Sequence, residues 1–308
     1  MSGRAMVSVS APLLPLKRNT RLLLAASRPR QWTKNLLVLA APAASGTLNH
    51  TNVLVHSVAA AAIFTLASVG GYLVNDAYDA HADRLHPVKR DRPVASGALS
   101  VRTAKILGYT LCTAALFTSG LLGPRFGITI LMYLVLTAAY SLRLKKITVI
   151  DIITIAMFFL LRAVGGGTAN GIPLSRWFLM VAAFGALFLV VGKRRAELTT
   201  MGSDAPDHRD VSALYSPEWL AQVQGLALTA TVVAYCLWAF QSVDHESVLH
   251  SLVALSTIPF TTALLRYSLL VSRGDGERPE QLLVHDRLLV GCAVSCGLML
   301  VLGWYVAH

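Results

Sequence analysis

A run of polar residues with metal-binding chemistry lies at Asn75–Asp83, where NDAYDAHAD directly follows an apolar segment. If the helix of that segment continues through the run, Asn75, Asp79 and Asp83 are spaced i, i+4 and i+8 and share one face within about 80°. Three oxygen ligands on one stripe suit Mg²⁺, which binds one or two carboxylates together with substrate phosphate oxygens and water. We therefore predict Asn75, Asp79 and Asp83 as Mg²⁺ ligands.

The same run provides further candidates for chemistry. Asp76 points about 100° away from Asn75 on a helix, so we expect it to support the metal site or contact substrate, and we count Asp76, Asp79 and Asp83 as candidate catalytic residues. Cations follow at once, at Arg84, Lys89, Arg90 and Arg92. A metal site beside anion-binding side chains is what a diphosphate needs. The alternative is a solvated acidic helix end.

The composition places these residues in a membrane protein. Hydrophobic residues make up 55% of the 308 and charged residues 14%, against about 25% charged in soluble domains. Several apolar runs reach the roughly 20 residues that cross a bilayer. We predict an all-α protein with about nine transmembrane helices, at roughly 33–47, 53–74, 103–121, 125–142, 147–165, 177–192, 220–241, 248–271 and 287–306. The first is short and contains Pro42, which is typical of a proline-broken or tilted helix.

The basic residues set the expected orientation. They gather in alternate connections, whereas the other connections hold only Arg125 and Arg176. The positive-inside rule then places the N-terminus and the polar loops in the cytoplasm and the C-terminus outside, in a multi-pass protein of the inner (plasma) membrane. We expect a central cavity open to the cytoplasm, a flexible cytoplasmic tail over 1–20, and one transmembrane catalytic domain over 21–308.

Other function classes fit less well. A net charge of +11 could indicate nucleic-acid binding, but the basic residues lie in short blocks between apolar segments, so no nucleic-acid partner is expected. All four cysteines fall within apolar runs, which is typical of small hydrophobic side chains and not of a disulfide or metal framework.

The stretch NDAYDAHADRLHPVKRDRPVASG resembles the first aspartate-rich signature of the UbiA superfamily of intramembrane prenyltransferases. That resemblance implies a UbiA-like fold and a diphosphate bound through Mg²⁺ at this motif. Ordinary members carry a second aspartate-rich motif after the sixth span. This chain has GKRRAEL there, in which Glu197 is the only acid, and Asp204, Asp207 and Asp210 follow in a hydrophilic stretch.

Lys193 and Arg194 of GKRRAEL suit a phosphate without metal. Together with RPRQWTKN, HPVKRDRP and IPLSRWFL, this stretch resembles the decaprenyl-phosphate phosphoribosyltransferases of actinobacteria over about 28–290. Those pentosyltransferases move phosphoribose from phosphoribosyl diphosphate to a polyprenyl (decaprenyl) phosphate, release diphosphate, and supply cell-wall arabinan synthesis. The resemblance implies that Lys193, Arg194 and Glu197 bind the 5-phosphate and ribose. An i, i+4 ion pair of Lys193 with Glu197 is the alternative.

The remaining candidates lie at the ends of spans. Tyr140 and Lys145 resemble a Tyr and Lys that superfamily members place near the diphosphate. The alternatives are that Tyr140 is an aromatic residue of the membrane interface and that Lys145 only sets the orientation of the protein in the membrane. Asp151 enters the hydrocarbon layer, where a carboxylate has a high free energy unless it is paired or lines a water-filled cavity. We therefore expect it to contact ribose hydroxyls. Lys34, beside Trp32, either binds substrate or anchors the interface. Arg162 either binds substrate or snorkels to the far interface, and Arg266 is expected to snorkel.

Two rival functions remain. A UbiA-type enzyme would move an isoprenoid from its diphosphate to an aromatic acceptor, against which GKRRAEL argues. A transporter or lipid-binding scaffold would also have many spans and buried charges, but would not need an acidic stripe beside cations. The sequence leaves open the lipid length and whether the protein forms a homo-oligomer.

Overall fold

The structure is a computed structural model that describes residues 16–201, 214–241, 251–274, 282 and 285–303. Every regular element in this part of the chain is helical, which confirms the predicted all-α class. Of the predicted tail, residues 1–15 lie outside the described part, and 16–20 begin the first helix. The elements are α1 (Leu16–Ser27), η1 (Pro29–Leu39), α2 (Ala40–Ala44), α3 (Thr51–Leu85), η2 (Lys89–Asp91), α4 (Val101–Ser119), η3 (Gly120–Leu122), α5 (Pro124–Leu142), η4 (Leu144–Lys146), α6 (Ile150–Asn170), α7 (Arg176–Met201), α8 (Pro217–Gln241), α9 (Ser251–Leu255), α10 (Thr257–Ser272) and α12 (Arg287–Val301).

Seven helical stretches in the described part are long and apolar enough to cross a membrane. They correspond to the second through the eighth predicted spans, with α9 and α10 forming one stretch over Ser251–Ser272. The last predicted span contains α12, a shorter apolar helix. The helical multi-pass architecture is thus confirmed, and the count of nine spans stays a prediction.

The first predicted span is broken into the 3₁₀ helix η1 and the short α-helix α2. Pro42 explains the break, because it has no N–H to donate to the carbonyl of Val38, four residues before it. That carbonyl lies against Gly166 of α6, where an added Cβ would stand 1.9 Å from the Val38 oxygen. The glycine therefore allows the broken segment to pack directly on the α6 backbone.

Helix α3 carries the aspartate-rich run out of the apolar layer. Its 35 residues span roughly 52 Å at 1.5 Å per residue, whereas the hydrocarbon layer is only about 30 Å thick. The helix continues without interruption to Leu85, as the spacing argument for Asn75, Asp79 and Asp83 requires. The last turns of α3 thus hold these side chains on one continuous helix.

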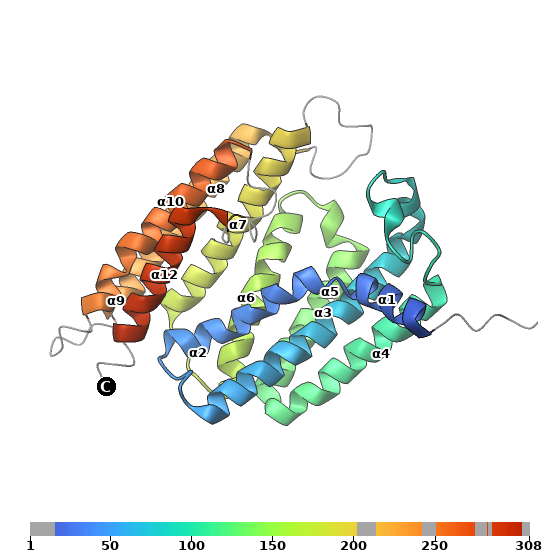
Figure 1. Ribbon diagram of the computed structural model, residues 1–308, viewed down its shortest axis with the longest axis horizontal. Coiled ribbons are helices and arrows are strands. Elements are labelled where there is room, and N and C mark those ends of the chain that lie inside the picture. Colours follow the sequence, from blue (N-terminus) through green and yellow to red (C-terminus); the bar gives the residue numbers. More distant parts are fainter. Residues whose placement is uncertain (1–15, 202–213, 242–250, 275–281, 283–284, 304–308) are drawn as a thin grey trace, which may run out of the picture.

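Packing joins the helices into one bundle. α3 packs on α4, α6 packs on both α5 and α7, and α7, α8 and α10 contact one another, with α12 against α10 (Figure 1). Close approach of α3 and α4 depends on Gly70 and Gly108, since a Cβ on Gly70 would lie 2.8 Å from the Gly108 oxygen. Phe64 and Phe126 are fully buried in a core that α3, α4, α5 and α6 share.

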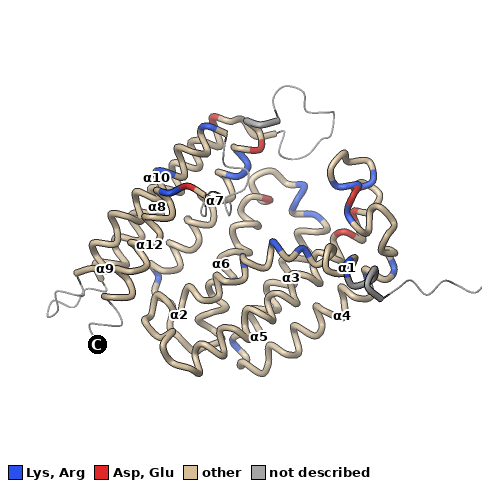
Figure 2. Tube along the Cα trace, in the orientation of Figure 1, with Lys and Arg blue, Asp and Glu red and all other residues tan. Residues whose placement is uncertain are grey.

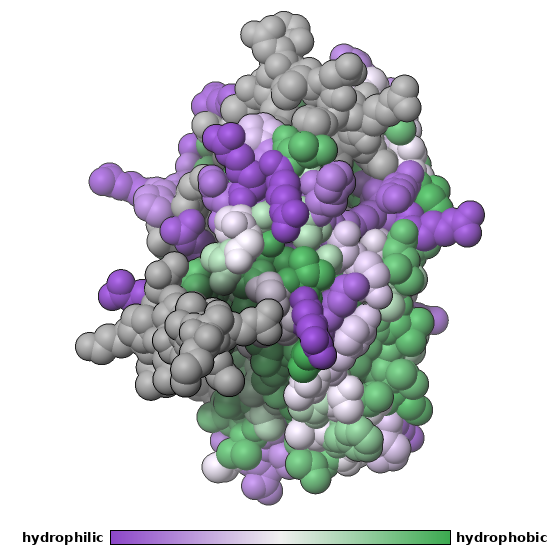
Figure 3. Space-filling view, turned by 90° about the vertical axis from the view of Figure 1, so that its right-hand side faces the viewer, coloured by the Kyte–Doolittle hydropathy of each residue, from purple (hydrophilic) through white to green (hydrophobic). Residues whose placement is uncertain are grey.

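Charged residues gather at one end of this bundle. Figure 2 shows most of the acidic and basic positions at the end where α3 and α7 finish and α6 begins. In Figure 3 hydrophilic side chains gather in the upper half of the face shown, and hydrophobic ones cover most of the lower half. Alternating helix directions therefore bring polar segments that are distant in sequence to the same end.

Candidate active site

The end of α3 meets the connection between α5 and α6 at Asp79. The Lys145 ammonium lies 2.6 Å from both carboxylate oxygens of Asp79 and 3.5 Å from the Asn75 side-chain oxygen. The Asn75 amide also donates to Asp79, at 3.0 Å. Lys145 thus contacts both Asn75 and Asp79, two of the predicted metal ligands.

Asp76 and Asp83 occupy a neighbouring site with two arginines. Asp76, whose side chain is only 3% exposed, accepts from Arg28 at 2.5 Å and from Arg92 at 3.3 Å. Arg92 also donates to the buried Asp83, at 2.8 Å. The two carboxylates therefore hold Arg28 and Arg92 side by side, and any effect of Asp76 on a substrate would pass through these arginines.

The donor set at Asn75 and Asp79 fits a hard divalent cation. Three oxygens from these two residues already surround a cationic atom, the Lys145 nitrogen, at 2.6–3.5 Å. Carboxylate and amide oxygens are ligands of the kind that Mg²⁺ takes, with phosphate and water completing the octahedron. In the described part of the chain, no group of three or more His, Cys, Asp or Glu side chains could hold a metal. A metal here would therefore rely on substrate oxygens for the rest of its ligands.

A second polar cluster joins α6 to α7. Asp151, in the first turn of α6, is 1% exposed and accepts from the Tyr215 hydroxyl at 2.5 Å and from Arg194 at 3.3 Å. Burial, reinforced by the hydrogen bond to Asp151, raises the pKa of Tyr215 to about 12. Both Asp151 oxygens are engaged, so a direct contact with ribose requires one of these partners to move.

The GKRRAEL stretch is helical, because α7 continues to Met201. Arg194 bonds Glu197 at 3.4 Å as well as Asp151. Lys193 is 48% exposed and lies 3.7 Å from Glu197. This is the i, i+4 ion pair that the sequence offered as the alternative to phosphate binding. This helix end therefore presents exposed positive charge. Asp204, Asp207 and Asp210 lie outside the described residues.

Arg162 lies inside the bundle, so the alternative that it snorkels to the far interface is wrong. It is 3% exposed and donates to the Asn35 side-chain oxygen at 2.7 Å and to the Tyr133 hydroxyl at 2.9 Å. Its partners are neutral, and its guanidinium also faces the Phe159 ring. Lys34, next to Asn35, places its ammonium 5.6 Å from the same ring. Arg162 thus anchors η1 beside Lys34.

The other predicted residues lie around this end of the bundle. Tyr140 packs edge-on against Phe158, with ring centroids 5.9 Å apart. Lys89 and Arg90 are in η2, where the Arg90 side chain is exposed. Arg266, which we expected to snorkel, pairs with Asp286 at 2.8 Å.

Sequence reasoning missed three residues that the structure brings into the site. Arg28 lies in the quoted RPRQWTKN stretch, and its left-handed backbone, with φ of 53°, helps aim it at Asp76. Asn35 and Tyr215 are uncharged, and nothing in their spacing connects them to Arg162 or Asp151. Only folding brings these polar partners together.

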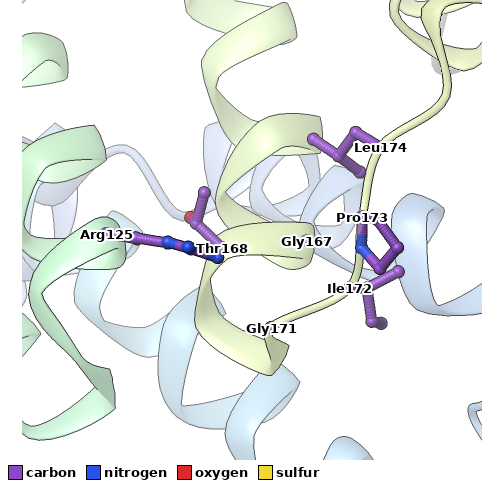
Figure 4. Close-up of a pocket in the computed structure, with 7 residues that line it drawn as sticks. All are labelled: Arg125, Gly167, Thr168, Gly171, Ile172, Pro173 and Leu174. Carbon is purple, nitrogen blue, oxygen red and sulfur yellow. The ribbon is translucent and has the colours of Figure 1, made fainter.

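A separate cavity of about 280 Å³ lies between the start of α5 and the end of α6. Figure 4 shows Arg125 and Thr168 on one side of the end of α6, with Ile172, Pro173 and Leu174 on the other side. None of the predicted site residues lines this cavity. It belongs to the opposite ends of α5 and α6 from Lys145 and Asp151, so it is distinct from the polar site.

The chain is similar to known proteins along most of its length. The model of the UbiA prenyltransferase family matches residues 36–290. Decaprenyl-phosphate phosphoribosyltransferases from Mycobacterium tuberculosis and Corynebacterium glutamicum are 40% and 38% identical, over 88% and 91% of this chain and 94% and 86% of theirs. A solved structure of a UbiA homologue from Archaeoglobus fulgidus, bound to DMAPP and Mg²⁺, has a TM-score of 0.69 at 20% identity and covers 92% of this chain and 98% of that chain. At that identity it establishes the shared fold. The chain belongs to the UbiA prenyltransferase family.

Proposed function

We propose that this protein is a Mg²⁺-dependent pentosyltransferase. It transfers 5-phosphoribose from phosphoribosyl diphosphate to a polyprenyl phosphate of the decaprenyl type, releases diphosphate, and so provides a precursor for cell-wall arabinan. The names of the relatives that are 38–41% identical support this activity. The fold, shared with a homologue bound to DMAPP and Mg²⁺, supports a diphosphate donor.

The observation that carries the proposal is the difference between the two polar clusters. One combines the oxygens of Asn75 and Asp79 with Lys145, which suits a metal-bound diphosphate. The other presents Lys193 and Arg194 at the end of α7, which suits a phosphate without metal. A donor with a diphosphate at one end and a single phosphate at the other matches both.

Asn75 and Asp79 are our proposed Mg²⁺ ligands, and Asp83 joins them directly or through water if its pair with Arg92 opens. A bound Mg²⁺ would supply Lewis-acid stabilisation of the leaving diphosphate. Lys89, Arg90, Arg92 and Lys145 would bind the remaining diphosphate oxygens, since arginine can grip phosphate with two parallel hydrogen bonds and lysine acts as a point charge. Asp76 would hold Arg92 in place.

The ribose phosphate would lie toward α7. Lys193 and Arg194 would bind the 5-phosphate, and Glu197 would orient them. Asp151 would act on the ribose side of the donor through Arg194, because its own oxygens are engaged. Tyr140 and Lys34 would complete the wall of the site, and Arg162 would contribute by holding the segment that carries Lys34.

The chemistry needs no strong base. The acceptor is a phosphate monoester, largely ionised at neutral pH because its second pKa is near 6. One of its oxygens attacks the anomeric carbon while the bond to diphosphate breaks, and diphosphate leaves with the electron pair. Attack opposite the leaving group inverts the centre, turning an α donor into a β product. The isoprenoid tail would lie between helices in the bilayer.

The same proposal sets the membrane topology. The polar end faces the cytoplasm of the inner membrane, because the positive-inside rule assigns the basic connections to that side. We propose that the N-terminus is cytoplasmic and the C-terminus outside. Labelling of introduced cysteines with a membrane-impermeant reagent, in intact and in permeabilised cells, tests this assignment.

Separate incubations of the purified protein with two donor–acceptor pairs test the function. Labelled phosphoribosyl diphosphate with decaprenyl phosphate should give a Mg²⁺-dependent lipid product, whereas an isoprenoid diphosphate with an aromatic acceptor should give none. Transfer of the isoprenoid alone would establish the rival prenyltransferase activity. Binding of either donor without turnover would indicate a transporter or scaffold.

A further inference from the structure

The connection that follows Lys145 contains a strained residue. Val149, just before α6, has φ of 70° and ψ of −45°. A positive φ is a genuine outlier for a β-branched side chain. Such strain costs about 1–3 kcal/mol, persists only where surrounding contacts enforce it, and clusters at functional sites. The backbone at Val149 therefore needs an external partner.

Tyr215 is that partner. Its hydroxyl accepts the Val149 N–H at 2.6 Å and donates to Asp151 at 2.5 Å. Its ring stacks on Trp219, with centroids 5.2 Å apart and an interplanar angle of 15°. The side chain is buried in a cluster with Ile152 and Leu220. One hydroxyl thus bonds two points of the connection into α6 while the ring fixes its position.

These bonds connect the two proposed halves of the donor site. Val149 lies four residues after Lys145, which faces Asp79. Asp151 accepts from Arg194 on α7, where we place the ribose phosphate. The Tyr215 hydroxyl therefore joins the connection that follows Lys145 to the carboxylate that binds Arg194.

We propose that Tyr215 is a positioning residue that fixes the distance between the Lys145 and Arg194 sides of the site and so favours donors with anionic groups at both ends. The inference rests on the proposed function for the identity of the donor. A ligand that binds both sides at once gains from their fixed spacing, as in linked binding sites. A ligand that binds one side alone gains nothing from it.

Tyr215→Phe tests this, because it removes the hydroxyl and keeps the stacked ring. Dissociation constants are measured by calorimetry in Mg²⁺ for phosphoribosyl diphosphate and for inorganic diphosphate. We expect the first to rise about tenfold, as for a lost buried hydrogen bond, and the second to stay within about twofold. Donor KM should rise in parallel, with kcat at saturating donor within about threefold.

Tyr235→Phe is the matched control. The Tyr235 hydroxyl is also buried, and it bonds Ser256 at 2.8 Å, away from the polar end. It should lower the thermal midpoint as Tyr215→Phe does while leaving both dissociation constants unchanged. Equal weakening of both ligands in Tyr215→Phe, or a lower kcat with unchanged donor KM, overturns the proposal.

Two further outcomes are distinguishable. If the wild-type protein neither binds nor transfers phosphoribose, the proposed function fails; if it does both and Tyr215→Phe binds the donor normally, only this inference fails. Should Tyr215→Phe not fold, Val149→Gly is added, because glycine takes a φ of 70° without steric cost. Failure of that double variant to fold also overturns the proposal, since Tyr215 would then be merely structural.

Discussion

Replacing Arg162 by methionine should destabilise the protein strongly, although the change removes a charge from the interior. Methionine keeps an unbranched stem but donates no hydrogen bond. The buried Asn35 oxygen and Tyr133 hydroxyl lose donors that lie 2.7 and 2.9 Å away. Each buried acceptor left unpaired costs about 1–3 kcal/mol. Relief from burying the guanidinium offsets part of this loss, which gives a net loss of about 2–4 kcal/mol.

Thermal unfolding of the purified protein in detergent measures this loss. At roughly 2–4 °C per kcal/mol, the value for chains of about 150–250 residues, the midpoint should fall by about 4–16 °C. Arg125→Met is the matched control, because Arg125 is exposed, and it should shift the midpoint by about 1 °C or less. If Arg162→Met unfolds at the same temperature as this control, the guanidinium reaches solvent and the reasoning is refuted.

A double-mutant cycle tests the pairing itself. Asn35→Ala leaves the buried guanidinium without one of its neutral acceptors, which should cost about 1–3 kcal/mol, or more because the donor is charged. The double variant removes both partners, so its loss should be smaller than the sum of the single losses by at least about 1 kcal/mol. Additive losses would show that Arg162 does not act through Asn35. Donor KM should rise in each variant, because Asn35 adjoins Lys34.

Three further predictions concern the polar end. Asp79→Ala should reduce turnover about 100-fold or more while the fold is retained, because the metal loses a carboxylate ligand. Asp91→Asn, at an exposed position, is the control. Near-normal transfer by Asp79→Ala at low Mg²⁺ would exclude the metal assignment. Lys193→Ala should raise donor KM about three- to tenfold and leave lipid KM unchanged, as measured by initial rates; an unaltered donor dependence would contradict its placement. Burial raises the pKa of Tyr215 to about 12, above the roughly 10 of an unfolded chain, so its hydrogen bonds stabilise the fold fully below pH 10 and are lost as the pH rises through 12. Between these pH values the thermal midpoint of the wild type should fall more steeply with pH than that of Tyr215→Phe. Equal slopes would exclude this contribution of Tyr215 to stability.

Local sequence predicted the fold well wherever one helix obeys one pattern. The apolar runs predicted the helices α3 through α8 to within a few residues at most ends. The departures arise where polar residues continue a helix beyond the apolar layer, as at the ends of α3 and α7. Hydrophobicity marks the bilayer and not the helix, so the pattern ended before the helices did.

The sequence by itself determined the membrane class, the family and the helical spacing of Asn75, Asp79 and Asp83, because length, hydrophobicity and i, i+4 spacing are local properties of the chain. Tertiary structure alone decided which charges meet. Lys145 and Asp79 are 66 residues apart in sequence, and Arg162 and Asn35 are 127 apart. Such pairs form because antiparallel packing returns separate helix ends to one place, and because a buried polar group must find a partner within the bundle. No spacing rule along the chain carries that information.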